Sequence, residues 1–196
     1  MPRHRTSAPY CVACRLRYSL CVCAQAPLLN VATRLIVIMH SKEWSSLANT
    51  GHFTRLALRN AEIRLHGLSH QTVSCDGLDT ASSSTLVLFP GGSSYPLTKQ
   101  YLAPLSRPLT LLVPDGTWNQ AKNMMRRIPM LRQAQRIRLE GPSLGLLCSR
   151  RNIDGNRRST FEAIAQTLGF LEGLETEDHL LRFFRQVLDR RKQDGG

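Results

Sequence analysis

The residues with the plainest capacity for chemistry are four cysteines near the N-terminus, Cys11, Cys14, Cys21 and Cys23. A Cys-x-x-Cys pair presents two sulfurs from one turn, and the cysteines of an extended Cys-x-Cys point the same way, so each pair can chelate a metal ion. Four thiolates without a vacant position are typical of structural rather than catalytic zinc. The segment is too short to bury a core of its own, so a bound metal would supply folding energy. Free or redox-active thiols are the alternative, and we expect the isolated Cys75 and Cys148 to be inert.

A second reactive side chain is Asp115, which follows an apolar run and opens the turn Asp115-Gly-Thr-Trp118. A carboxylate at such a turn can act as a general base, bind the ammonium or hydroxyl groups of a ligand, or simply cap a helix. The indole of Trp118 can stack on a nucleic-acid base, and packing in the core is the alternative. His40 and Glu43 follow another apolar run, where they can line a site or form a structural pair.

These side chains need strands and helices that hold them in place. Short apolar or alternating runs predict strands over residues 34–39, 85–89, 109–113 and 135–139. Helices are expected within residues 45–58, after Trp118, from the capping box Ser159-Thr-Phe-Glu162 to about Leu171, and over residues 178–191. Strands that alternate with helices favour an α/β fold with a mostly parallel sheet.

Three segments stand where predicted strands end, which is where parallel α/β sheets bind their ligands. They are residues 40–43, Pro90-Gly91-Gly92, and Asp115-Gly116-Thr117-Trp118. Glycines at strand ends let the backbone approach a ligand closely, although an ordinary turn is the alternative for Pro-Gly-Gly. Ser159 and Thr160 begin a helix whose free N–H groups favour an anion. The sequence therefore predicts a ligand site built from these ends.

The chain carries a formal net charge of +12 and has a pI near 10.2, a balance that attracts polyanions and nucleic acid first. Arginine supplies most of the positive charge and binds phosphate in a bidentate way. Two basic runs flank the predicted site, and a solvated charged surface is the alternative. The candidate RNA-binding residues are Lys42, Lys122, Arg126, Arg127, Arg150, Arg157 and Arg158. No apolar run is long enough for a membrane helix and no secretory signal is recognised, so we expect a cytoplasmic protein with no membrane partner.

The motifs together resemble one known family. Asp115-Gly116-Thr117-Trp118 resembles the signature of the DTW-domain family of tRNA-uridine aminocarboxypropyltransferases. Further blocks resemble that family in the right order: the four N-terminal cysteines, His40-Ser-Lys-Glu43 with Asn49-Thr50-Gly51, Leu88-Phe-Pro-Gly91, and Ser159-Thr-Phe-Glu162-Ala163. The resemblance extends from about residue 10 to about residue 190. Ser41 stands where the family usually has proline and Phe161 where it has leucine, and neither change removes a reactive group.

The resemblance implies an enzyme that transfers the 3-amino-3-carboxypropyl group of S-adenosylmethionine (SAM) to N3 of a uridine in tRNA and releases methylthioadenosine. It also implies a SPOUT-like α/β fold with a C-terminal knot that holds SAM. A SAM-dependent RNA methyltransferase and a non-catalytic, zinc-containing RNA-binding module are the other function classes. DNA is not expected as a partner, and the sequence does not indicate an oligomeric state.

These expectations give a division of the chain and a set of site residues. Residues 1–27 form a basic tail and a zinc-binding motif, and residues 28–196 form the catalytic domain. The catalytic residues are Asp115 and Trp118. The cofactor-binding residues are Pro90, Gly91, Asp115, Gly116, Thr117, Ser159, Thr160 and Glu162.

Overall fold

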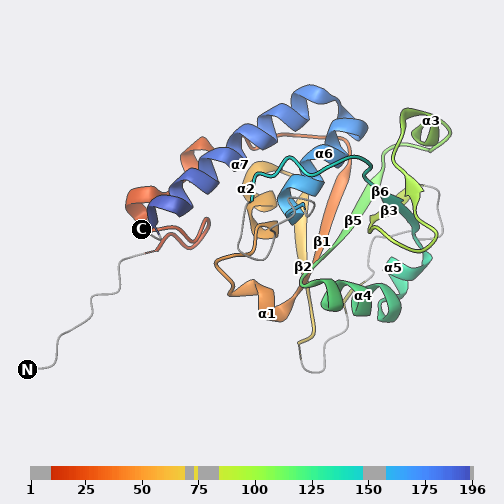
Figure 1. Cartoon of the computed structure of the whole chain (residues 1–196), viewed down its shortest axis with the longest axis horizontal. Helices are drawn as coiled ribbons and strands as arrows, with labels where there is room; N and C mark the ends of the chain where they lie inside the picture. The colour runs from red at the N-terminus through yellow and green to blue at the C-terminus, as the bar shows by residue number, and fades with distance from the viewer. Residues whose placement is uncertain (1–9, 69–72, 75–83, 148–157, 195–196) are drawn as a thin grey trace, which may run out of the picture.

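The computed structural model describes residues 10–68, 73–74, 84–147 and 158–194. Within these ranges, six strands form one sheet in the order β2-β1-β5-β3-β6-β4, and every neighbouring pair is parallel (Figure 1). The strands are β1 (Arg34–His40), β2 (Ala61–His66), β3 (Thr85–Leu88), β4 (Tyr95–Pro96), β5 (Thr110–Asp115) and β6 (Gln135–Arg138). The predicted α/β fold is confirmed, and the sheet is wholly rather than mostly parallel.

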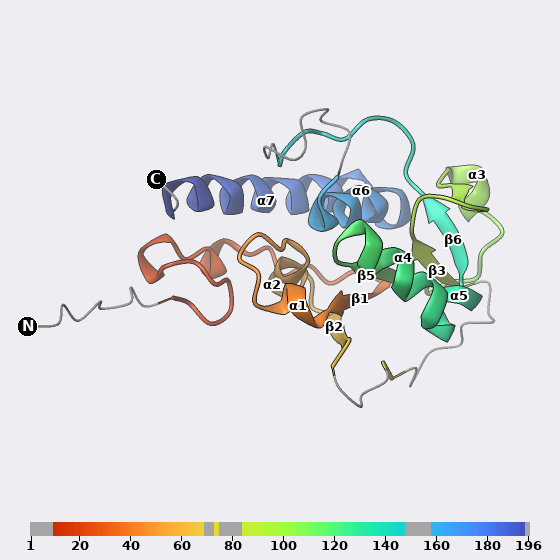
Figure 2. The same cartoon turned by 60° about the horizontal axis from the view of Figure 1, so that its bottom comes forward.

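Helices cover both faces of the sheet, as two views of the molecule show (Figures 1 and 2). One face packs against α4 (Trp118–Arg127) and α5 (Pro129–Gln133), and the other packs against α6 (Thr160–Glu172) and α7 (Leu174–Asp194). Alternation along β1 explains the two layers, because Ile36 and Ile38 belong to the α4–α5 core while Leu35 and Val37 belong to the α6–α7 core. Three further short helices are α1 (Ser41–Trp44), α2 (Thr54–Ala57) and α3 (Lys99–Leu102).

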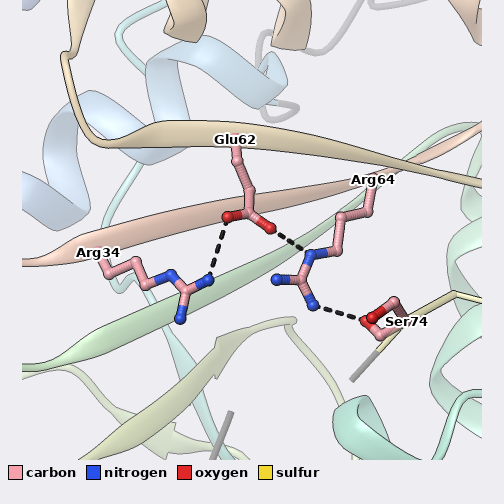
Figure 3. Close-up of polar contacts among 4 residues, drawn as sticks. All are labelled: Arg34, Glu62, Arg64 and Ser74. Atoms are coloured by element: carbon pink, nitrogen blue, oxygen red, sulfur yellow. Dashed lines mark hydrogen bonds and ion pairs between the residues drawn. The ribbon is translucent and has the colours of Figure 1, made fainter. Parts of the chain in front are cut away.

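The edge strand β2 has no counterpart in the predicted elements. Its sequence, Ala-Glu-Ile-Arg-Leu-His, alternates in polarity, and all six residues are only partly buried. Glu62 lies between two arginines: it accepts a hydrogen bond from Arg34 of β1 at 3.1 Å and another from Arg64, whose Nη1 donates to the Ser74 carbonyl at 2.5 Å (Figure 3). Burial raises the pKa of Glu62, but the two arginines lower it further, so it lies below its usual value. Charged side chains thus stabilise β2, an edge strand without a continuous apolar run.

The N-terminal cysteine segment packs onto the last helix. Cys14, Leu16 and Val22 are buried in the same core as Phe184 and Val187 of α7. The segment contains two 3-10 turns, η1 (Tyr18–Leu20) and η2 (Cys23–Gln25), and no α-helix. It therefore shares the hydrophobic core of the sheet rather than forming a separate one. None of the described helices is long and apolar enough to cross a lipid bilayer.

Candidate functional site

A pocket of about 560 Å³ opens where β3, β5 and β6 end and where α6 begins. Its walls are mostly apolar and come from four segments that are far apart in the sequence. They comprise Leu88, Phe89, Pro90, Val113, Pro114, Gly116, Trp118, Ala121, Leu139, Arg158, Ser159, Thr160 and Ala163. This is the size and composition of a small-molecule site, and it lies at the carboxyl ends of parallel strands.

The pocket brings together many of the residues predicted from sequence. Pro90, Gly116, Trp118, Ser159 and Thr160 all line it. The apolar walls went unpredicted, although Leu88 and Phe89 directly precede the Pro-Gly turn that drew attention to this strand end. Gly91, Thr117 and Glu162 do not line the pocket.

Those three residues have other contacts in the structure. Gly91 is exposed, with φ +111°, and holds the turn after β3. Thr117 is the N-cap of α4, where it forms a capping box with Gln120, so Asp115 is not the cap. Glu162 was expected to close a capping box with Ser159. Only its backbone N–H binds the Ser159 hydroxyl, while its carboxylate accepts from Ser143 at 2.8 Å and from the Leu144 N–H at 2.7 Å.

Asp115 lies behind the pocket wall and is only 3% exposed. Thr160, which lines the pocket, donates its hydroxyl to Oδ1 at 2.5 Å, and Asn49 donates to Oδ2 at 2.7 Å. Burial raises the pKa of Asp115, and these two hydrogen bonds only partly oppose that rise. The carboxylate thus joins β5 to the start of α6 and to the loop before α2.

The Asn49-Thr50-Gly51 segment is part of this site, a role that the sequence analysis did not assign to it. Asn49 binds Asp115, and the Thr50 hydroxyl accepts from the Phe161 N–H at 3.3 Å. Any larger residue at position 51 would clash with Asp115, because a Cβ built on Gly51 would overlap the Asp115 Oδ2 atom. The predicted helix in this region begins here, as η3 (Gly51–Phe53) followed by α2.

A buried histidine extends these contacts toward the cysteines. The His52 N–H donates to Asn49 Oδ1 at 3.2 Å, and its ring Nε2 lies 3.4 Å from the Cys14 carbonyl oxygen. Burial lowers the pKa of His52 to about 4, so the ring is neutral at pH 7. A neutral ring that carries its proton on Nε2 donates to that carbonyl. Hydrogen bonds therefore run from the cysteine segment through His52 and Asn49 to Asp115.

The four cysteine sulfurs lie within 4.8 Å of one another. Cys11 and Cys23 are 3.6 Å apart at Sγ, and Cys14 and Cys21 are 3.7 Å apart. A tetrahedral ion with Zn–S bonds of about 2.3 Å has sulfur–sulfur edges of about 3.8 Å, so the cluster can hold such an ion. A backbone hydrogen bond from Cys14 lowers the pKa of Cys11 to about 7, while burial raises the pKa of Cys14 and Cys23.

Aromatic rings form one wall of the pocket. Phe89 and Trp118 stack with centroids 5.1 Å apart and an interplanar angle of 14°. Trp118 remains 49% exposed, and the Lys122 ammonium lies 5.3 Å from its ring centroid. Ala121 and Met125, which follow Trp118 along α4, are buried. An exposed, stacked indole next to a cation is suited to hold a flat, electron-rich ring.

The predicted RNA-binding residues lie in different environments. Lys42, Lys122, Arg126 and Arg127 are exposed, whereas the Arg158 guanidinium is held by carbonyl groups of residues 140–142 and by Gln166. Arg150 and Arg157 lie outside the described residues, as do Cys75 and Cys148. His40 accepts the Lys42 N–H at 3.2 Å and meets His66 edge to face, and neither a hydrogen bond nor an ion pair joins it to Glu43.

Comparison with known proteins places these features in context. A family profile described as "DTW domain" matches residues 8–192. Proteins named tRNA-uridine aminocarboxypropyltransferase 2 are similar to this chain: 26% identical in Macaca fascicularis, over 84% of this chain and 57% of the relative, and 27% identical in Mus musculus, over 86% and 58%. One from Drosophila melanogaster is 25% identical over 83% of this chain and 66% of its own length.

The chain thus spans less than two thirds of the length of these relatives. No solved structure matches it.

Proposed function

The chain belongs to the DTW domain family, and on that premise we propose that it is a tRNA-uridine aminocarboxypropyltransferase. It would transfer the 3-amino-3-carboxypropyl group of SAM to N3 of a uridine in tRNA. The observation that carries this proposal is the coincidence of the family's signature turn, Asp115 to Trp118, with a pocket at the carboxyl end of β5. The names of the relatives supply the reaction class.

The reaction breaks the bond between the sulfonium sulfur of SAM and the Cγ of its methionine part. A new bond forms between that Cγ and uridine N3, the N3 proton is released, and methylthioadenosine leaves with the electron pair of the broken bond. A methyltransferase would use the same leaving-group strategy at another carbon, so the outcome depends on which carbon faces the acceptor. The pocket walls must therefore orient SAM as well as bind it.

The pocket residues suit the parts of SAM. The first turn of α6, at Ser159 and Thr160, offers N–H groups and a positive dipole end to the carboxylate. Pro90 and Gly116 allow the ligand to lie close to the backbone. The Trp118 ring can stack on adenine or on the target uracil. Gly91, Thr117 and Glu162 remain predicted cofactor-binding residues that would act from outside the pocket lining.

We propose that Asp115 receives the N3 proton, as the sequence analysis predicts. Its raised pKa favours proton acceptance. Because Thr160 and Asn49 already donate to its two oxygens, proton transfer would proceed through, or in exchange with, the hydroxyl of Thr160, a residue that lines the pocket. If Asp115 instead binds the ammonium or ribose groups of SAM, its substitution should weaken SAM affinity rather than slow the chemical step.

The cysteine cluster would hold a structural zinc ion. The two sulfur pairs have the spacing of a tetrahedral site, and four sulfurs leave no position for substrate. The positive charge of the chain would serve tRNA, whose phosphates it attracts. The SPOUT-like character and the C-terminal knot also belong to this proposal.

The test is an assay of the sulfur product. The protein, incubated with SAM and tRNA that lacks its modifications, should release methylthioadenosine, and nucleoside mass spectrometry should detect an aminocarboxypropylated uridine. Release of S-adenosylhomocysteine would establish the methyltransferase reading in its place. Absence of SAM turnover with tRNA, in a preparation that binds tRNA, would support a non-catalytic RNA-binding module.

A further inference from the structure

A second pocket lies beside the first, with Phe89 lining both. It measures about 360 Å³ and is lined by residues of α4, α5 and β6. The helices α4 and α5 lie on the face of the sheet opposite α6 and α7 (Figure 1). Phe89 and Met125 form its apolar base. Four cations surround them: Lys122, Arg126, Arg132 and Arg136.

No described carboxylate forms an ion pair with any of the four cations. Arg126 donates to Asn123 at 3.1 Å, and Lys122 lies over the Trp118 ring. Like charges that the described residues leave without a counter-charge repel one another, so the arrangement gains most from an anionic ligand. Arginine guanidinium groups on either side of an apolar surface bind phosphate through paired N–H groups.

The smaller pocket adjoins the larger one through a shared aromatic residue. Phe89, whose ring stacks on Trp118, lines both pockets, so the proposed SAM and uracil site and the four cations share this side chain. Arg136 reaches the glycine turn after β3, since a Cβ built on Gly92 would lie 3.5 Å from its Nη1. A polynucleotide that places one base against Trp118 would have the cations of the second pocket next to that base, because Lys122 lies over the Trp118 ring.

We propose that the second pocket binds a backbone phosphate of the tRNA, next to the uridine that enters the larger pocket. Arg132 and Arg136, which no sequence motif identified, would hold this phosphate together with Lys122 and Arg126. Phosphate contacts of this kind fix the register of a nucleic acid while the base is recognised elsewhere. The inference rests on the proposed function, because it takes the larger pocket as the place of the target uridine.

The test compares two double variants that lose the same charge. Arg132→Gln with Arg136→Gln removes cations from the pocket. Arg185→Gln with Arg190→Gln removes two exposed arginines from α7, on the opposite layer. Binding of unmodified tRNA is measured by filter binding over a range of salt concentrations. Methylthioadenosine release is measured against tRNA concentration, and circular dichroism checks that each variant is folded.

The pocket variant should lose roughly tenfold in tRNA affinity per contact, and the slope of log affinity against log salt should fall by about 0.7 per contact in a single strand. Its KM for tRNA should rise while kcat at saturating tRNA and SAM affinity stay near wild type. The α7 variant should show a small change only. Lys122→Gln, on a different element, should repeat the loss if the pocket variant proves unstable.

Equal losses and equal slopes in the two double variants would overturn the phosphate site, and so would unchanged tRNA binding in the pocket variant. The proposed reaction and the phosphate site can be overturned independently of each other. If S-adenosylhomocysteine appears while the pocket variant still loses tRNA affinity, the phosphate site stands and the reaction assignment falls. If methylthioadenosine appears while the pocket variant binds tRNA normally, the reaction stands and the phosphate site falls.

Discussion

Asp115 combines two properties that place different demands on it. Its raised pKa suits a group that accepts a proton, yet it is almost fully buried and both oxygens already accept hydrogen bonds. Asparagine at this position keeps the shape, accepts from Asn49 through its carbonyl and donates to the Thr160 hydroxyl, which can rotate. The variant therefore separates the charge and basicity of the carboxylate from its packing.

We expect Asp115→Asn to lower the single-turnover rate by roughly 10²–10⁴, the usual contribution of a general base, with SAM affinity retained. Release of methylthioadenosine at saturating SAM and tRNA measures the rate, and calorimetry measures SAM binding. Glu177→Gln is the matched control, because Glu177 also has a pKa raised by burial but lies on α7, away from the pocket. A near-wild-type rate would remove Asp115 from the chemical step, and weakened SAM affinity alone would make it a SAM ligand.

The same substitution should change stability with pH. Since burial raises the pKa of Asp115 above its usual 3.8, the folded protein holds this proton more tightly than the unfolded chain. That stabilisation is complete below the unfolded pKa and is lost as pH rises through the folded pKa. Asp115→Asn should therefore raise Tm at neutral pH, and its advantage should shrink in acid. Melting curves followed by circular dichroism over this range check the trend, and a lower Tm throughout would mean that the hydrogen bonds outweigh desolvation.

At the scale of elements, the sequence predicted best those that carry an apolar pattern. The runs that became β1, β3 and β5 are buried and rich in branched residues, so their identity follows from composition. β2 alternates in polarity, a pattern that also indicates a strand, but it was not among the predicted elements; the Arg34–Glu62 ion pair that joins it to β1 forms only when the two strands pair. α5 begins at Pro129, separated from α4 by one residue, and its five residues are too few to show a helical period in the sequence.

The cysteine segment is the element whose stability depends most on a ligand. We expect one zinc per chain, bound through the four sulfurs, and we expect a chelator to increase hydrogen exchange in residues 10–24 and along the covered face of α7. The sheet should stay folded, because its core contains both helical layers. Elemental analysis and exchange mass spectrometry test this, with zinc added back as control. Absence of stoichiometric zinc in reduced protein would contradict the assignment.

Across the whole molecule, the site is assembled from segments that sequence patterns alone cannot order. Of the three strand ends predicted to bind a ligand, those of β3 and β5 meet at one pocket, which residues 40–43 after β1 do not line. Only the order β5-β3-β6 brings Trp118, Pro90 and Leu139 together there with the start of α6. The Asn49–Asp115 and Thr160–Asp115 contacts join residues 66 and 45 positions apart. Reactive residue types and strand ends were therefore predictable, whereas the apolar lining and the hydrogen bonds between distant loops were not.

The exposed ring stack gives the molecule an optical property. The chain has two tryptophans, and one of them, Trp118, lies in the pocket wall while Trp44 packs under Arg15, whose guanidinium is 4.5 Å from its ring centroid. A ligand that covers the Trp118 indole would shield it from water and alter its emission. We expect SAM or tRNA to change the intrinsic fluorescence by the same amount in wild type and Trp44→Phe. In Trp118→Phe the fluorescence should not change when the ligand is added. The protein would then report occupancy of its own pocket without a label.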